Sequence, residues 1–310
     1  FNTGYADKDG NIFYVYNAKI PERNNDFNWN ELLPGDKKAN IWTNYVPFDS
    51  LPQVLNPPEG FLQNCNSNPY LATGNSNDMS NPLSDWTGIE THQTNRALRA
   101  LETFGADSSI SREDFFTYKY DTQYSLNSVI AKVRDRYVAE METNTDPKLL
   151  PALKLIKNWN LSADSSNTAA ALAIIVLPNA FNEDKLKYKT DKITQKLHET
   201  IDYLETKFGK IDVPLGKVLR LVRGETNLPL SGGPGLLRAI YFKKKDDLYI
   251  GTAGDCYFQA VEWGPNGELN AWTIHQFGSA TTIESSKHYD DQAKLFSKHK
   301  MKQVRGLNKD

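Results

Sequence analysis

Three carboxamide side chains, Asn64, Asn66 and Asn68, lie close together in one short segment of the sequence. The apolar pair Phe61-Leu62 precedes them, so the sequence predicts a short strand that ends in a carboxamide-rich loop. An Asn side chain donates two hydrogen bonds without adding a competing charge, and can therefore stabilise the oxyanion that forms during acyl transfer. Clusters of Asn, Ser and Pro are also typical of ordinary turns. Composition alone leaves both interpretations open.

The order of residues in and around this loop resembles a known family. The pattern Asn-Pro-Pro-x-Gly, three residues, then Asn-Cys-Asn-x-x-Pro over 56–69 is similar to the strand and oxyanion loop of the penicillin acylase family of N-terminal-nucleophile (Ntn) hydrolases. That family includes acyl-homoserine-lactone and aculeacin acylases. Further matching segments follow in the family's order: 5–12, 21–23, 51–52, 159–160 and 288–292. The resemblance implies an α+β fold, as part of a four-layer αββα Ntn-hydrolase sandwich with an inserted helical subdomain.

The resemblance also implies how the chemistry is divided between chains. In the family, a Ser whose own amino group begins the large chain attacks an amide carbonyl, the amine serves as base, and a covalent acyl-enzyme is then hydrolysed. The present sequence corresponds to the C-terminal part of that large chain, and its first residue is Phe1. We therefore expect the nucleophilic Ser on an upstream chain or segment of the same precursor.

Two catalytic roles of the family carry over to residues of this sequence. By the spacing within 64–66, Asn66 matches the side chain that holds the oxyanion, and Asn64 is expected to order the loop. Arg96 matches the first Arg of the family's Arg-x-x-Arg pattern, with Arg99 as the alternative. A guanidinium that donates to the Asn66 carbonyl would turn its NH2 group toward the oxyanion and favour a neutral terminal amine. Without the resemblance, Arg96 would be interpreted as an ordinary Arg on a helix surface.

No cofactor is predicted, although calcium remains a candidate. Penicillin acylases proper hold a calcium ion through an acid that follows the catalytic Asn. Asp78 lies near that position, but its neighbours at 75–77, Asn-Ser-Asn, depart from the family's pattern. His288, which precedes two acids at 290–291, is interpreted structurally, and the resemblance implies that this segment starts a C-terminal helix.

Composition excludes two classes of partner. The 310 residues include 36 Lys and Arg against 38 Asp and Glu, a formal net charge of −2, and no basic stripe dominates, so nucleic-acid binding is not expected. The longest apolar run, 169–177, is far shorter than the roughly 18 to 20 residues of a membrane helix. Because members of the resembled family are usually exported and cut from a precursor, we expect a periplasmic or secreted bacterial protein whose targeting segment lies upstream.

The two cysteines, Cys65 and Cys256, are too few for the disulfide framework of a small secreted protein. They could form one disulfide bridge with each other or remain as two thiols, and the resemblance favours thiols.

Hydrophobic periodicity predicts strands at both ends of the chain and helices between them. Residues 4–18 predict a hairpin around Asp9-Gly10, and 21–58 should be mostly loop. Helical spacing covers 94–104, 125–141, 148–158, 165–177 and 184–208, and a further helix is expected to begin at 111–114. Strands are expected at 248–252, 256–263 and 269–275, and a flexible turn at 231–235. This organisation predicts a strand-rich Ntn core from 1–90 and 245–310, and a mainly helical insert over 91–244.

The sequence therefore predicts the C-terminal fragment of an amidohydrolase that cleaves the amide of an N-acylated small molecule or lipopeptide and is inactive alone. The Asn-Cys-Asn loop favours the acyl-homoserine-lactone or aculeacin type, which acts on fatty-acyl amides, over the β-lactam type. The alternative is a non-catalytic ligand- or peptide-binding module derived from the acylase fold, because this chain has no residue that could act as an N-terminal nucleophile.

Overall fold

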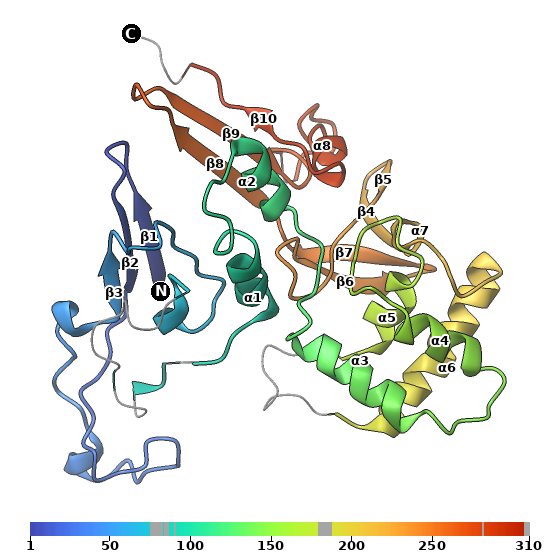
Figure 1. Cartoon of the computed structure of the whole chain (residues 1–310), viewed down its shortest axis with the longest axis horizontal. Coiled ribbons are helices and arrows are strands. Elements are labelled where there is room, and N and C mark those ends of the chain that lie inside the picture. The colour runs from blue at the N-terminus through green and yellow to red at the C-terminus, as the bar shows by residue number, and fades with distance from the viewer. Residues whose placement is uncertain (75–82, 84–86, 90, 179–187, 281, 307–310) are drawn as a thin grey trace. The chain divides into compact units, whose positions relative to one another are not determined.

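The computed structural model describes residues 1–74, 83, 87–89, 91–178, 188–280 and 282–306 (Figure 1). By its internal contacts the chain divides into two compact units, Phe1–Ser109 and Ile110–Asp310, here called the N-terminal unit and the C-terminal unit. Both units contain helices and strands. Across the described residues, the helices are all too short or too polar to cross a membrane.

The N-terminal unit is built on a three-stranded antiparallel sheet in the order β1-β2-β3, namely β1 (Asn2–Ala6), β2 (Ile12–Tyr16) and β3 (Gln53–Leu55). The predicted hairpin is confirmed, since Tyr5 pairs with Phe13 across its two strands. The Asp7 carboxylate fixes its turn by accepting hydrogen bonds from the backbone N–H groups of Asp9 and Asn11, each at 2.9 Å. The sheet carries two small apolar clusters, one around Tyr14 and one around Val15.

The rest of the N-terminal unit is mostly loop, as predicted. Its described residues include the short 3-10 helices η1 (Lys38–Asn40), η2 (Phe48–Ser50) and η3 (Pro69–Leu71), and the α-helix α1 (Asn95–Glu102). Trp29 and Trp42 meet edge to face with ring centroids 6.0 Å apart. Thr94 caps the N-terminus of α1 by accepting a hydrogen bond from Ala97 N.

The C-terminal unit holds the larger core. Its helices are α2 (Arg112–Lys119), α3 (Val129–Glu140), α4 (Leu150–Lys157), α5 (Ala170–Val176), α6 (Thr190–Phe208), α7 (Leu215–Val218) and α8 (Ala293–Ser297). The predicted start of α2 is confirmed, because Ser111 and Asp114 form a reciprocal capping box. The alanine-rich α5 is almost wholly buried and packs against α6, as its small side chains indicate.

The described residues of this unit also form two sheets. A four-stranded sheet has the order β5-β4-β7-β6, and a three-stranded one has the order β10-β9-β8. Their strands are β4 (Leu219–Arg223), β5 (Thr226–Pro229), β6 (Ile240–Lys245), β7 (Leu248–Gly254), β8 (Tyr257–Trp263), β9 (Leu269–His275) and β10 (Lys302–Gln303). The hairpin of β8 and β9 is confirmed. Strands β4, β5 and β6 were not predicted, and most of their length lies in the segment expected to be mainly helical.

Of the flexible turn predicted at 231–235, only Pro234 and Gly235 form a turn. Ser231, Gly232 and Gly233 are buried, and Gly232 N donates to Ala163 O at 2.8 Å. A Cβ atom on Gly232 would come within 2.5 Å of Arg238 O, and the φ angle of Gly232 is +114°. The glycines therefore serve close packing of backbone against backbone.

The contact-based units differ from the domain boundaries expected from the sequence. The structure separates the chain after Ser109 and includes α1 in the N-terminal unit. The predicted domains were a strand-rich core from 1–90 and 245–310, and an insert over 91–244. They describe how the chain is arranged in the complete αββα sandwich, and they stay a prediction.

Substituting Gly232 with Ala should lower the free energy of unfolding by about 3 kcal/mol or more, because it adds a backbone clash to an unfavourable φ. Gly267→Ala is the matched control: its φ is +82° and nothing lies within 4 Å of the new Cβ, so strain alone should cost about 1 kcal/mol. Chemical denaturation measures both. Equal losses in the two variants would contradict the packing argument.

Candidate active site

The carboxamide loop is held from within by Asn64. Its Oδ1 accepts a hydrogen bond from the backbone N–H of Asn66 at 2.9 Å, and its Nδ2 donates to Tyr14 Oη and Ser67 O, each at 3.4 Å. Asn66 has a φ angle of +57°, in the left-handed region that Asn tolerates better than most residues. Asn64 therefore orders the loop in a conformation that exposes the next Asn side chain.

Tyr14 connects this loop to the sheet. Its ring is 2% exposed and lies on β2, and its hydroxyl donates to Asn2 Oδ1 while accepting from Asn64 Nδ2. Burial raises the pKa of Tyr14 well above its usual value, so the hydroxyl keeps its proton at every physiological pH.

Arg96 contacts Asn66 directly. Its NH2 group donates to Asn66 Oδ1 at 3.0 Å, over a separation of 30 positions in the sequence. A guanidinium only donates hydrogen bonds, so the amide oxygen must face it and the amide NH2 group must point elsewhere. Across the described part of the chain, no atom accepts a hydrogen bond from Asn66 Nδ2. The exposed side chain of Asn66 thus presents an oriented donor pair to its surroundings.

The two arginines of the Arg-x-x-Arg pattern have different partners. Arg96 lies in the first turn of α1 and is half-buried, whereas Arg99 NH1 forms an ion pair with Glu102 Oε2 at 2.7 Å one turn further along. The structure therefore brings Arg96, and not Arg99, to Asn66. The Nε atom of Arg96 is buried and lacks a hydrogen-bond partner among the residues that the structure describes.

Asn68 is a further structural residue of the loop, and sequence reasoning did not assign it a role. Its backbone N–H donates to His92 O and its side chain to Thr91 O, both at 3.1 Å. Its Oδ1 also caps η3 by accepting from Tyr70 N. The Asn-Pro sequence at 68–69 is a helix-start signal that could have revealed this cap.

The model of the family described as penicillin amidase matches residues 1–309. The chain belongs to the penicillin amidase family. It is 37% identical to penicillin G acylase of Escherichia coli over 68 residues, which are 22% of this chain and 8% of that protein. It is 24% identical to the penicillin acylase 2 proenzyme of Pseudomonas sp. (strain SE83) over 169 residues, which are 54% of this chain and 20% of that protein.

A solved structure shows the fold of this penicillin amidase family member. The thermostable penicillin G acylase from Alcaligenes faecalis, in its orthorhombic form, aligns with a TM-score of 0.55 and 14% sequence identity. The alignment covers 99% of this chain and 64% of that one. The predicted family and the α+β fold class, matching the Ntn-hydrolase fold, are thereby confirmed. This chain spans less than two thirds of the length of each of these relatives.

The sequence analysis also singled out an acid, a histidine and two cysteines. Asp78, the calcium candidate, lies outside the described residues. His288 Nδ1 is 2.8 Å from Asp291 Oδ2, and the C-terminal helix α8 begins only at Ala293, so His288 precedes this helix and does not start it. No disulfide joins Cys65 to Cys256. In the described ranges, no group of three or more His, Cys, Asp or Glu residues could hold a metal ion.

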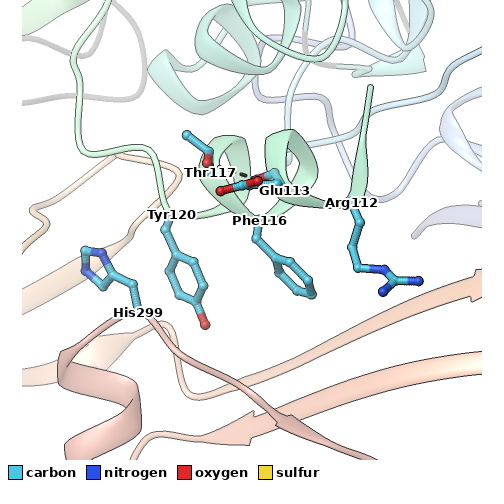
Figure 2. A pocket seen from close by; sticks show the side chains of 6 residues that line it. All are labelled: Arg112, Glu113, Phe116, Thr117, Tyr120 and His299. Carbon is cyan, nitrogen blue, oxygen red and sulfur yellow. Dashed lines mark hydrogen bonds between the residues drawn. The ribbon is translucent and has the colours of Figure 1, made fainter. Parts of the chain in front are cut away.

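The C-terminal unit contains a surface pocket of about 610 Å³ (Figure 2). Its lining residues are Arg112, Glu113, Phe116, Thr117, Tyr120 and His299. The rings of Tyr120 and His299 stack with centroids 5.0 Å apart, and Arg112 forms a two-pronged ion pair with Glu262 at 2.6 and 2.9 Å. Burial raises the pKa of Tyr120 to about 12. The pocket therefore presents aromatic surface and no activated nucleophile.

His299, in the wall of this pocket, should make the unfolding free energy depend on pH. Burial, together with the positive charges of Arg238 and Lys119 and against the effect of Asp164, lowers its pKa from 6.5 to about 4. Between those pH values His299 is protonated in the unfolded chain but mostly neutral in the folded chain. The free energy of unfolding therefore falls as the pH drops from 7 to 4. The loss should be about 1 to 3 kcal/mol.

Urea unfolding of the protein and of His299→Asn, at pH 7 and pH 4, measures this contribution. Asn tolerates the left-handed φ of +56° at this position but does not titrate. Between pH 7 and pH 4, the free energy of unfolding of His299→Asn should fall by about 1 to 3 kcal/mol less than that of the unmodified protein. An identical pH dependence in the two proteins would show that His299 titrates normally.

Proposed function

We propose that this chain is the C-terminal part of an amidohydrolase of the acylase type, which cleaves the amide bond of an N-acylated small molecule or lipopeptide. The observation that carries the proposal is the hydrogen bond from Arg96 to Asn66 Oδ1, which leaves the Asn66 NH2 group oriented and without an acceptor in the described residues. Family membership supports the reaction class.

In the proposed reaction, an N-terminal Ser on another segment attacks the substrate carbonyl, and negative charge develops on the carbonyl oxygen. Asn66 Nδ2 donates a hydrogen bond to that oxygen. The donor is fixed before the reaction begins, so little reorganisation is needed when the charge appears. The positive charge of Arg96 stabilises the same anion and favours the neutral form of the terminal amine that acts as base.

The partner is an upstream chain or segment of the same precursor, and without it this chain is inactive. The exposed side chains of the N-terminal sheet support such a partner: Tyr5 on β1 is 55% exposed and Leu55 on β3 is 62% exposed. Strand β1 is also an edge strand, exposed along most of its length, and can accept a further strand. The buried Nε of Arg96 is a donor that an additional chain could satisfy.

We further propose export to the periplasm or secretion by a bacterium, with proteolytic processing of the precursor. A fatty-acyl amide is the favoured substrate type, which would make antibiotic or quorum-sensing signal degradation the biological role. The proposed chemistry uses side chains and a terminal amine, so it requires no cofactor. Calcium near Asp78 remains a separate proposal, to be tested by metal analysis.

A second candidate function is a non-catalytic ligand-binding module. The pocket of Figure 2 favours it, because its apolar rings offer a surface to an aromatic or acyl ligand. The two functions differ in what Asn66 does: a module binds ligand equally well without it, whereas the acylase loses turnover.

In the enzyme assembled with its upstream chain, Asn66→Ala should lower kcat by about 10² to 10³ and change KM little, because the donor acts on charge that exists only in the transition state. Asn66→Asp should be as inactive, since it keeps the tolerance for the left-handed φ but cannot donate. Asn25→Ala removes another exposed Asn side chain and serves as the control. An unchanged kcat in both Asn66 variants would remove Asn66 from the mechanism.

Replacing Arg96 should change the pH dependence as well as the rate. Removing a positive charge raises the pKa of a neighbouring amine, so the acidic limb of the kcat/KM profile should move to higher pH in Arg96→Met. Arg96→Lys keeps the charge but not the planar donor, so it should lose kcat with a smaller shift. Arg99→Lys, on the same helix, is the control. If Arg96→Met and the unmodified enzyme share one acidic limb, Arg96 does not tune the amine.

A further inference from the structure

The candidate site is made by two segments that are distant in the sequence. Asn66 lies in the carboxamide loop, and Arg96 lies 30 positions later in the first turn of α1. The direction of the Asn66 NH2 group therefore depends on how the loop is aligned with the helix. An oxyanion donor must be held within about 0.5 Å of its productive position, so this alignment needs its own contacts.

One hydroxyl group contacts the neighbours of both residues. Thr94 Oγ1 donates to Cys65 O at 3.3 Å and accepts from Ala97 N at 3.2 Å. Cys65 directly precedes Asn66, and Ala97 directly follows Arg96. The Thr94 side chain is 3% exposed, so water does not compete freely for either hydrogen bond.

An N-cap residue needs only an acceptor, and Ser, Thr, Asp and Asn all supply one. The hydrogen bond to Cys65 O is a second function, which requires a proton on the same side chain. A hydroxyl provides both from a single atom, whereas a carboxylate provides only the acceptor. The residue type at 94 is thus more restricted than capping alone demands.

We propose that Thr94 is a positioning residue: it fixes the alignment of the carboxamide loop with α1, and so fixes the direction of the Asn66 NH2 group. The activity part of this inference rests on the proposed function. The two hydrogen bonds of Asn68 hold the segment just before Thr94 in place independently. Loss of the Thr94 hydroxyl should therefore shift the donor without unfolding the loop.

Three substitutions separate positioning from capping. Thr94→Ser keeps both hydrogen bonds and should retain kcat within about threefold. Thr94→Asp keeps the cap on Ala97 N but has no proton for Cys65 O, and Thr94→Val loses both. In the assembled enzyme, both should lower kcat by about 10- to 100-fold with little change in KM, as a displaced catalytic donor would. Thr103→Val is the control, because Thr103 donates to Arg99 O at the other end of α1.

A crystal structure of Thr94→Val supplies a readout that does not depend on activity. The distance from Arg96 NH2 to Asn66 Oδ1, 3.0 Å here, should exceed about 3.5 Å in the variant and be restored in Thr94→Ser. If this distance stays at 3.0 Å in Thr94→Val, the inference is overturned.

The outcomes also distinguish this inference from the proposed function. If Asn66→Ala loses turnover while Thr94→Val and Thr94→Asp keep it, the inference about Thr94 fails and the acylase function stands. If Asn66→Ala keeps full turnover, the proposed function fails, and the crystallographic distance alone then decides whether Thr94 aligns the two segments.

Discussion

The hydrogen bond between Arg96 and Asn66 is the interaction on which the candidate site depends. A guanidinium has only donors, so it selects the amide oxygen as its partner and turns the amide NH2 group away from itself. That single constraint converts an ordinary carboxamide into an oriented donor with no acceptor among the described residues. The charge of the guanidinium adds a positive potential where an oxyanion would form.

The surrounding structure keeps this pair aligned at some local cost. Asn66 adopts a left-handed backbone conformation, which is unfavourable for most residues. The side chain of Asn64 offsets part of this cost by accepting a hydrogen bond from the backbone N–H of Asn66. Tyr14 ties Asn64 to the sheet. Among the described residues of the N-terminal unit, the apolar clusters are small. Hydrogen bonds to neighbouring backbone therefore contribute much of the order that a larger core would supply.

Local sequence patterns predicted the carboxamide loop and most of the helices. The Asn-Cys-Asn loop and the Arg-x-x-Arg pattern predicted Asn66 and Arg96 as site residues through their resemblance to a family; the structure joins the two side chains by a hydrogen bond, and their catalytic roles stay predictions. Periodicity located the long helices. The roles of Tyr14 and Thr94 could not be predicted, because they arise from contacts across 50 and 29 positions in the sequence. Strand β4 was missed since five residues with two buried leucines give little periodic signal. The glycines at 232–233 were misinterpreted because close packing and flexibility favour the same residue.

The most direct test of the central claim is a crystal structure of the assembled enzyme with a boronic or phosphonic acid that mimics the tetrahedral intermediate. Asn66 Nδ2 should lie about 2.7 to 3.1 Å from the oxygen that replaces the oxyanion, with Oδ1 still bonded to Arg96. An analogue bound to the assembled enzyme with that oxygen more than about 4 Å from Asn66, or facing another donor, would contradict the account.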